Sequence, residues 1–219
     1  MNIELISFSL CPFAQRAMIL LKQQKLNYNR VNINPMNPPD WFKALSPTGQ
    51  VPLLKVDEHI IFESDVIAEF INDISADNLH PENAITKANN RSWIAFSSTL
   101  FNDLFNMITA DKQAFNSCKS ALLSKLEKVE QVKNQAPFFN GDDFQLIDAA
   151  FAPFFMRLDW INQFTGQALS IAAFERLSVW SQSILALDAV QASVADGLDK
   201  VYYANIEARE GHLASLLID

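Results

Sequence analysis

The sequence of 219 residues contains only two cysteines, Cys11 and Cys118, and only three histidines. Two cysteines are too few for a secreted domain held together by disulfides, so a disulfide framework is excluded. The histidines lie far apart without the spacing of metal ligands, and we therefore expect no metal site: His59, His80 and His212. No apolar run approaches the roughly 18 residues of a membrane span, and no basic segment precedes an apolar core near the start. We expect neither a membrane helix nor a signal peptide.

The chain also lacks an excess of positive charge. It has 17 Lys and Arg against 25 Asp and Glu, which gives a formal net charge of −8. A surface of this sign repels phosphate backbones and anionic membranes, so we expect neither nucleic acid nor a membrane as a partner. Hydrophobic residues make up 49% and charged residues 19%, as in an ordinary folded soluble protein. The expected compartment is the cytoplasm.

Strand and helix signals alternate over the first third of the sequence. Residues 3–8 and 28–33 are typical of short strands. One apolar helical face lies between them: Ala14, Ala17, Met18 and Leu21. Two strands joined by a helix in this way are expected to be parallel, with a right-handed crossover.

The same region continues with a short helix and a hairpin. Residues 40–45 predict the helix, and residues 51–56 and 60–62 predict two antiparallel strands. Ser64 is a good N-cap for a third helix, whose apolar face contains Ile67, Phe70, Ile71 and Ile74. The predicted order is therefore β-α-β-α-β-β-α.

Strand signals largely stop after this region. Five later segments favour helix and are separated by Pro137, Gly141 and Gly166: residues 85–110, 113–134, 147–164, 174–187 and 194–209. We predict a first domain over residues 1–76, a linker over 77–82 and an all-helical domain over 83–219.

Cys11 stands where the first predicted strand ends and the first helix begins. Pro12 follows it, and proline is favoured at the first helical position. The free N–H groups and the positive end of the helix favour an anion there, so a thiol should ionise more easily and act as a nucleophile. The alternative is that Cys11 is merely a small buried residue.

Two further motifs flank the predicted hairpin. If the Val51–Pro52 bond is cis, the Val51 backbone faces outward and can pair with an extended peptide; the alternative is a trans proline that opens a strand. Glu63 and Ser64 start the third helix, where Ser64 could bind a ligand carboxylate and Glu63 a ligand amine. The alternative is a helix start that is only capped.

Together these features resemble the glutathione transferase family. The likeness is carried by Cys-Pro-Phe-Ala-Gln-Arg, Asp-Trp-Phe, Pro-Thr-Gly-Gln-Val-Pro and Glu-Ser, and it is nearest to the cysteine-type omega class and its bacterial relatives. It extends over essentially the whole chain. The fold that it implies is α/β plus all-α, with a thioredoxin-like N-terminal domain that binds glutathione and an all-helical C-terminal domain.

The resemblance also implies roles for individual residues. Cys11 would be the catalytic residue and would form a mixed disulfide with glutathione, which is the expected cosubstrate. Val51 would pair its backbone with the cysteinyl part of glutathione, beside Pro52. Glu63 and Ser64 would hold the γ-glutamyl end, and the wall of the site would be Phe13.

The second, apolar substrate would contact Leu10 and the first helix of the C-terminal domain at Phe96 and Leu100. Two departures from the family pattern stand out. The omega class commonly has a lysine that contacts the glycine end of glutathione, and Pro38 occupies that position here. The usual Ser/Thr-x-x-Asp capping box of the second domain reads Gln-Leu-Ile-Asp here and ends at Asp148.

Three functions remain open from the sequence. The first is glutathione-dependent thiol transfer at Cys11, with reduction of dehydroascorbate as a variant. The second is conjugation of glutathione to small electrophiles, in which Cys11 or Ser9 stabilises the thiolate of glutathione. The third is a regulatory member of the fold without catalysis. A homodimer is expected from the resemblance, with the first domain of each subunit against the second domain of the other.

Overall fold

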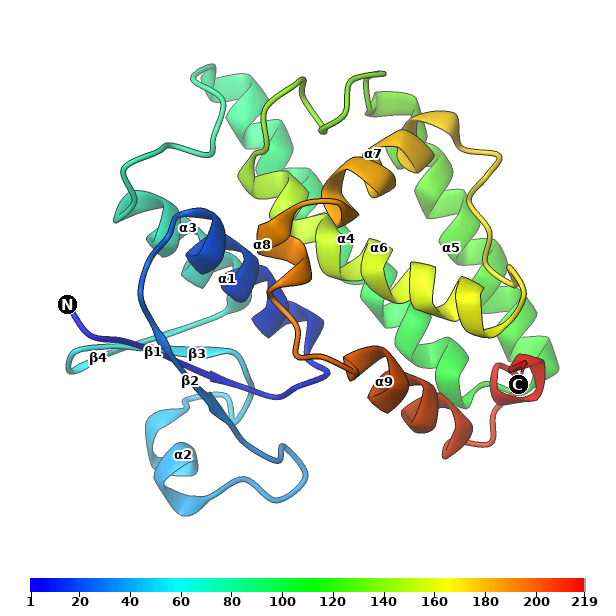
Figure 1. The fold of residues 1–219 in the computed structure, drawn as a ribbon, viewed down its shortest axis with the longest axis horizontal. Helices are drawn as coiled ribbons and strands as arrows, with labels where there is room; N and C mark the ends of the chain where they lie inside the picture. The colour runs from blue at the N-terminus through cyan, green and yellow to red at the C-terminus, as the bar shows by residue number, and fades with distance from the viewer. Residues whose placement is uncertain (219) are drawn as a thin grey trace.

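The structure, a computed structural model, describes residues 1–218 (Figure 1). Its first part has the predicted order of elements: β1 (Ile3–Ser7), α1 (Pro12–Gln23), β2 (Asn29–Asn32), α2 (Asp40–Leu45), β3 (Leu53–Val56), β4 (His59–Phe62) and α3 (Ser64–Asp73). The strands form one sheet in the order β2-β1-β3-β4. As predicted, β1 and β2 are parallel, while β3 pairs antiparallel with both β1 and β4. The thioredoxin-like prediction is confirmed.

Helices cover both faces of this sheet because the central strands carry apolar side chains on both faces. Leu5 and Leu54 are opposite each other in β1 and β3 and belong to the core formed with α1 and α3. Ile6 and Leu53 pack on the other face, where the side chain of Phe42 from α2 is fully buried. Figure 1 shows α2 on the side of the sheet opposite α1 and α3.

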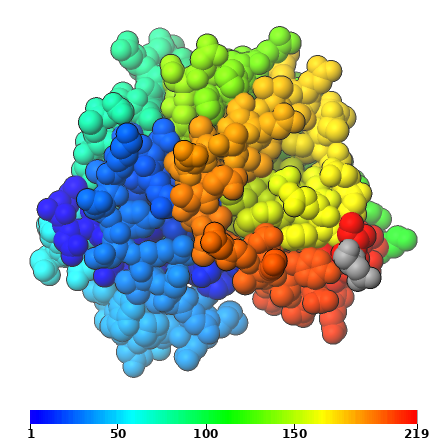
Figure 2. Space-filling model, in the orientation of Figure 1, coloured from blue at the N-terminus to red at the C-terminus, as the bar shows by residue number. Residues whose placement is uncertain are grey.

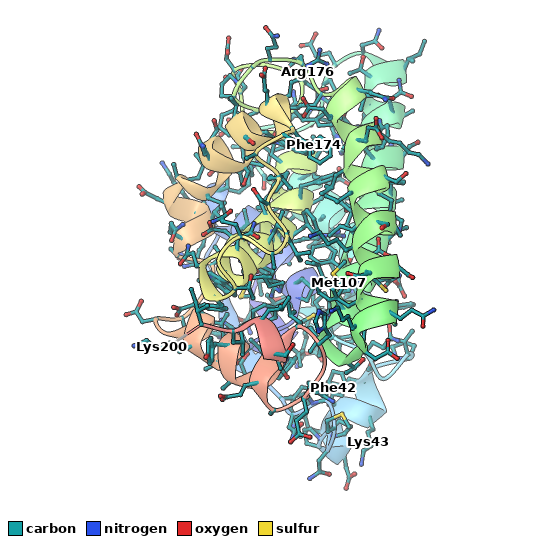
Figure 3. The ribbon with its side chains drawn as sticks, turned by 90° about the vertical axis from the view of Figure 1, so that its right-hand side faces the viewer. Phe42, Lys43, Met107, Phe174, Arg176 and Lys200 are labelled. Atoms are coloured by element: carbon teal, nitrogen blue, oxygen red, sulfur yellow. The ribbon has the colours of Figure 1, made fainter. Side chains whose placement is uncertain are left out.

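The remainder of the chain is helical, as predicted. Its helices are α4 (Ala84–Thr109), α5 (Lys112–Val132), α6 (Leu146–Phe164), α7 (Glu175–Leu185), α8 (Asp188–Gln191) and α9 (Leu198–Glu207), followed by the 3₁₀ turn η1 (Ala214–Leu216). Figure 3 shows the long helices α4 and α5 side by side. The short α8 is missing from the sequence prediction, and the last helix starts at Leu198 rather than 194. Gly197 precedes it with φ of +77°, a conformation that a helix cannot include. Within residues 1–218, no helix combines the length and the apolar character needed to cross a bilayer.

Helix α6 is the centre of the helical part and also packs against α1 of the sheet region. Most of its side chains are buried, and two phenylalanines pack against Trp180 of α7, with ring centroids 4.8 Å away for Phe151 and 5.0 Å for Phe155. Because α6 contacts both parts of the molecule, its position decides how the helical part lies against the first helix of the thioredoxin-like part.

The start of α6 is held by the Asp148 carboxylate. One oxygen accepts from the N–H of Gln145 at 2.7 Å, and the other accepts from the N–H of Phe139 at 2.9 Å and from the indole N–H of Trp180 at 2.6 Å. The missing hydroxyl of the family pattern therefore leaves the aspartate half of the capping box intact. Burial raises the pKa of Asp148 to about 6, against the lowering effect of these hydrogen bonds and of the Lys133 charge.

Candidate functional site

Cys11 is the N-cap residue of α1, and Pro12 is the first residue of the helix, as the sequence predicts. The sulfur accepts from the backbone N–H of Ala14 at 3.4 Å and donates to the carbonyl of Val51 at 3.7 Å. Only 8% of Cys11 is exposed to solvent. The thiol thus lies between the start of a helix and the backbone that leads into β3.

The pKa of the Cys11 thiol is raised above its ordinary value, because burial disfavours the thiolate. The N–H groups of Ala14 and Phe13 and the charges of Arg157 and Arg16 act in the opposite direction and lower the pKa. Burial is the largest of these effects. The predicted lowering effect of the helix start is therefore present, but the expectation that the thiol ionises more easily is wrong, because burial outweighs the helix and raises the pKa.

The backbone around Val51 has the geometry that one reading of the sequence required. The Val51–Pro52 peptide bond is cis, so the plain trans proline is excluded. Val51 is partly exposed, and β3 begins two residues later at Leu53.

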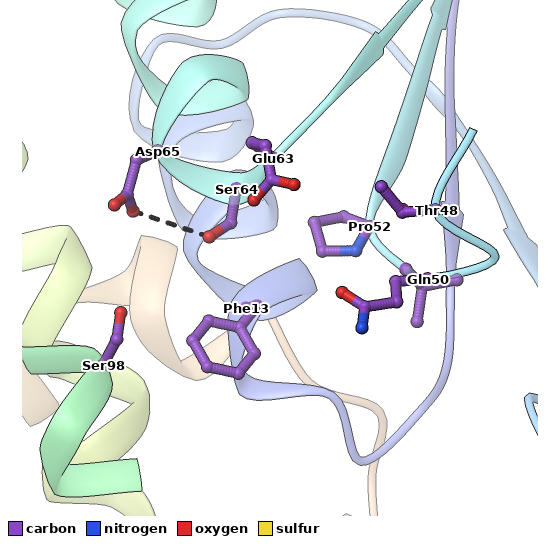
Figure 4. Close-up of a pocket in the computed structure, with 9 residues that line it drawn as sticks. Phe13, Thr48, Gln50, Pro52, Glu63, Ser64, Asp65 and Ser98 are labelled. Atoms are coloured by element: carbon purple, nitrogen blue, oxygen red, sulfur yellow. Dashed lines mark hydrogen bonds between the residues drawn. The ribbon is translucent and has the colours of Figure 1, made fainter. Parts of the chain in front are cut away.

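The start of α3 differs by one residue from the prediction. Glu63 is the cap residue, with φ of +68°, and Ser64 is already the first helical residue. A non-glycine residue in this region of φ is uncommon and marks local strain. The Ser64 hydroxyl donates to the carboxylate of Asp65 at 3.5 Å (Figure 4). The N–H groups of the first turn have no partner within the helix and can receive an anion.

A polar cavity of about 180 Å³ lies between the cis proline and the start of α3 (Figure 4). It is lined by all five residues predicted to bind glutathione: Phe13, Val51, Pro52, Glu63 and Ser64. Sequence reasoning missed its other four lining residues, which are Thr48, Gln50, Asp65 and Ser98. Thr48, Gln50 and Asp65 are close in sequence to the predicted motifs and could have been included. Ser98 comes from α4, and no local pattern distinguishes it.

Cys11 lines a second, larger cavity of about 600 Å³. Its lining residues come from the Cys11 loop, from the loops before and after α2, from the end of α4 and from α9 or just after it: Phe8, Leu10, Cys11, Pro12, Phe13, Pro35, Met36, Gly49, Gln50, Val51, Phe105, Ile108, Thr109, Tyr202, Asn205 and Arg209. Phe13, Gln50 and Val51 line both cavities. The two cavities are therefore neighbours, and Cys11 lines the larger one.

The predicted contacts of the second substrate are only partly brought together. Leu10 lines the larger cavity, but Phe96 and Leu100 do not. Leu100 is fully buried in the core, and Phe96 packs edge-on against Trp93 with ring centroids 5.1 Å apart. The assignment of these two residues is corrected: α4 reaches the cavity near its C-terminal end, through residues such as Phe105 and Ile108.

Two buried arginines surround the Cys11 loop. Arg157 of α6 donates to the carbonyl of Leu10 at 2.9 Å and to the side chain of Gln15 at 2.7 Å. Arg16 of α1 pairs with Asp65 at 3.1 Å, and it also donates to a hydroxyl of α4 and a carbonyl of α6. Arg16 ends the Cys-Pro-Phe-Ala-Gln-Arg motif but has no role predicted from the sequence, and Arg157 lies in no motif, because a buried arginine has the same local signature as one on a helix surface.

The other candidate residues lie away from the two cavities. Ser9 lines neither cavity, so it is not placed to replace Cys11. His80 is buried, and its Nε2 lies 2.9 Å from the carboxylate of Glu69. In the part of the chain that the structure describes, no three His, Cys, Asp or Glu side chains are grouped to hold a metal ion.

Comparison with known proteins yields one family match. Residues 10–74 match the family described as glutathione S-transferase, N-terminal domain. Omega-1 glutathione S-transferase of Sus scrofa is 30% identical over 162 residues, which are 72% of this chain and 67% of the relative. The probable glutathione S-transferase DHAR2 of Oryza sativa is 29% identical over 144 residues, which are 65% of this chain and 50% of the relative.

A solved structure supports the same fold. The crystal structure of rice GST1 in complex with glutathione has a TM-score of 0.85 and 19% sequence identity. The match covers 95% of this chain and 96% of the rice chain.

Proposed function

The chain belongs to the glutathione transferase family, and we propose that it catalyses glutathione-dependent thiol transfer through a mixed disulfide at Cys11. Dehydroascorbate reduction is included as a variant, since a relative of the DHAR type matches this chain. The observation that carries the proposal is the position of the sulfur. Cys11 lines the larger cavity, and its sulfur is 3.7 Å from the carbonyl of Val51, which lines both cavities.

In this proposal glutathione occupies the polar cavity as an extended peptide. The backbone of Val51 pairs with its cysteinyl residue, as a strand edge pairs with an added strand. The first-turn N–H groups at Ser64 receive the α-carboxylate of the γ-glutamyl residue, and Glu63 accepts from its amine. Phe13 forms one wall of this space and also lines the larger cavity. These placements are supported by the five lining residues of one cavity.

The chemistry then needs two exchanges at one sulfur. The Cys11 thiolate attacks the glutathionyl sulfur of a disulfide R–S–S–G, a Cys11–S–S–G bond forms, and the thiolate RS⁻ leaves. The thiolate of a second glutathione attacks the glutathionyl sulfur of this bond, so that oxidised glutathione leaves and the Cys11 thiolate is restored. The larger cavity admits the R group first and the second glutathione afterwards.

Glutathione binding itself would help Cys11 to ionise. The Cys11 thiol donates a hydrogen bond to the Val51 carbonyl, which favours the protonated form. In this proposal a glutathione N–H displaces the thiol from this carbonyl oxygen. The N–H of Ala14 and the charges of Arg157 and Arg16 then act on the sulfur without this opposing hydrogen bond.

Conjugation of glutathione to an electrophile is the second candidate function. The burial that raises the pKa of Cys11 favours it, because a protonated thiol can donate to the thiolate of bound glutathione instead of forming a bond with it. In this case Cys11 has the role that a hydroxyl has in serine-type members of the family.

Intact-mass analysis after incubation with oxidised glutathione tests the leading proposal. Both proteins carry Cys118→Ser to remove the other thiol. The protein that keeps Cys11 should gain one glutathionyl group, and the one with Cys11→Ala should gain none. If neither protein is modified while wild type conjugates a model electrophile, thiol transfer is refuted in favour of conjugation. A chain that is neither modified nor retained on immobilised glutathione would be a regulatory member without catalysis.

The proposal includes a homodimer and a cytoplasmic location, where glutathione keeps thiols reduced. Large apolar side chains remain exposed near the outer edge of the sheet, with 38% of Phe62 in β4 and 53% of Val66 in α3 accessible. Light scattering during size exclusion measures the assembly directly, and a monomer would contradict the dimer.

A further inference from the structure

The larger cavity has a charge pattern unlike that of the whole chain. The chain carries a net charge of −8, yet none of the residues that line this cavity is an aspartate or a glutamate. Arg209 is the one lysine or arginine among these lining residues. Most of the other lining side chains are apolar, among them Leu10, Phe105 and Ile108. A ligand in this space therefore meets apolar walls and one fixed positive charge.

Arg209 extends a row of polar side chains along one side of the cavity. Tyr202 and Asn205 of α9 precede it at spacings of seven and four residues, and all three line the same space. Arg209 is exposed, and neither its side chain nor that of Asn205 makes a hydrogen bond or ion pair with any other residue of 1–218. The guanidinium is thus available to a ligand. Figure 2 shows the surface hollowed between the light-blue loops near α2 and the orange-red α9.

We infer that Arg209, assisted by the amide of Asn205, binds a carboxylate of the second molecule that enters this cavity. The inference rests on the proposed function and names the class of its second substrate: a thiol or disulfide with an apolar or aromatic body and a carboxylate. A guanidinium binds a carboxylate through two parallel N–H···O bonds, which explains the choice of anion. The apolar walls bind the body of the substrate, and Cys11 is the reacting group in the same cavity.

The carboxylate could belong to the thiol substrate or to the second glutathione. The first glutathione is excluded, since Arg209 does not line the polar cavity where it is placed. Each of the two sources brings a carboxylate into the larger cavity at a different step. Two measurements on the same variants separate them.

The first measurement uses probes that cannot react. S-(4-carboxybenzyl)glutathione and S-(4-carbamoylbenzyl)glutathione differ only in whether the benzyl ring carries a carboxylate or a carboxamide. In both, a thioether joins the ring to the glutathione sulfur, so neither can exchange with a thiol. Calorimetry should show wild type binding the acid about fivefold more tightly than the amide, as an exposed charge-assisted bond allows. Arg209→Met should lose this preference and bind the amide unchanged. The preference of wild type should decline as salt is raised.

Lys200→Met is the matched control. It removes one positive charge from α9, the helix that ends just before Arg209, at an exposed residue that does not line the cavity. Figure 3 shows Lys200 at the outer edge of α9. This variant should keep the full preference for the acid. Equal weakening of acid and amide by Arg209→Met would overturn the inference, because it would indicate lost packing.

The second measurement follows the discharge of the preformed Cys11 mixed disulfide by glutathione. If Arg209→Met slows the discharge several-fold while both probes bind as in wild type, the carboxylate belongs to the second glutathione. Unchanged behaviour in both measurements overturns the inference. The probe measurement needs no chemistry at Cys11, so failure of the proposed thiol transfer leaves its outcome readable.

Discussion

Replacing Asp148 with asparagine isolates the pH dependence of one buried carboxylate. The carboxylate is fully enclosed at the start of α6 and accepts three hydrogen bonds, from Phe139, Gln145 and Trp180. Asparagine has nearly the same shape, but it cannot ionise and its NH₂ group faces one of these three donors. We expect a constant loss of about 1–3 kcal/mol from that unpaired donor at every pH.

The pH-dependent part follows from the two pKa values. Burial raises the pKa of Asp148 from 3.8 to about 6, so the folded protein binds this proton more tightly than the unfolded chain does. The resulting stabilisation is complete below pH 3.8 and is lost as the pH rises through about 6. At about 1.4 kcal/mol for each unit of pKa, the whole effect is roughly 3 kcal/mol, of which roughly 2 kcal/mol falls between pH 4.5 and 7.0.

Urea unfolding at a fixed protein concentration between pH 4.5 and 7.0 measures this effect. The quantity of interest is the free energy of unfolding of wild type minus that of Asp148→Asn, because contributions of other titrating groups largely cancel. It should fall by roughly 2 kcal/mol across the range. Lys133, whose charge acts on Asp148, has a pKa lowered only to about 8 and stays largely protonated throughout.

Asp143→Asn is the control, because it removes an exposed carboxylate from the same loop without disturbing the three donors. A difference that stays level with pH, or one that grows in favour of wild type as pH rises, would refute the account of Asp148. The result also bears on the site, because α6 carries Arg157 and so holds the carbonyl of Leu10 beside Cys11.

Two other changes give direct readings of the site and its support. The rate at which iodoacetamide alkylates Cys11 can be followed by intact mass in a Cys118→Ser background. This rate should rise steadily as the pH rises past neutrality, because burial raises the thiol pKa. A rate that reaches a plateau at or below pH 7 would contradict this. Arg157→Met should slow the reaction further at each pH and Arg157→Lys should recover part of the rate, since the charge lowers that pKa, and equal rates in all three proteins would exclude the effect. Gly211→Ala should lower the free energy of unfolding by about 1–3 kcal/mol in thermal unfolding, because the added Cβ would overlap the carbonyl of Ile108. Gly141→Ala places its Cβ in open space and should be nearly neutral. Equal losses in the two variants would show that crowding at Gly211 is not the cause.

The β-α-β-α-β-β-α order could be predicted from the sequence because each of its elements has a strong local signal. The alternation of apolar residues marks the strands, and α2 is found at its predicted bounds, Asp40–Leu45. The details around α9 could not be predicted in the same way. Residues 194–209 favour helix throughout, and only the left-handed backbone at Gly197 separates α9 from the preceding turn. A glycine permits such a conformation but does not require the chain to adopt it.

The residues of the site divide along the same line. The Cys11, Val51–Pro52 and Glu63–Ser64 motifs are local, so the sequence brings them to notice, and the structure gathers all of them around adjoining cavities. The wall formed by α4 and α9 depends on which face of each helix turns towards Cys11. Helical spacing gives that face only relative to the core. Phe96 and Leu100 were therefore placed two turns too early, and Arg209 was not noticed.

The pKa of Cys11 shows why the local and the tertiary contributions have to be weighed together. A thiol at a helix start receives N–H groups that favour the thiolate, and this part follows from Cys11 and Pro12 alone. Its surroundings include the Val51 carbonyl before β3 and Arg157 of α6, which are distant in sequence and which no local pattern describes. Because burial has the larger effect, the pKa of the Cys11 thiol is raised, and the protonated thiol donates a hydrogen bond to the carbonyl of Val51.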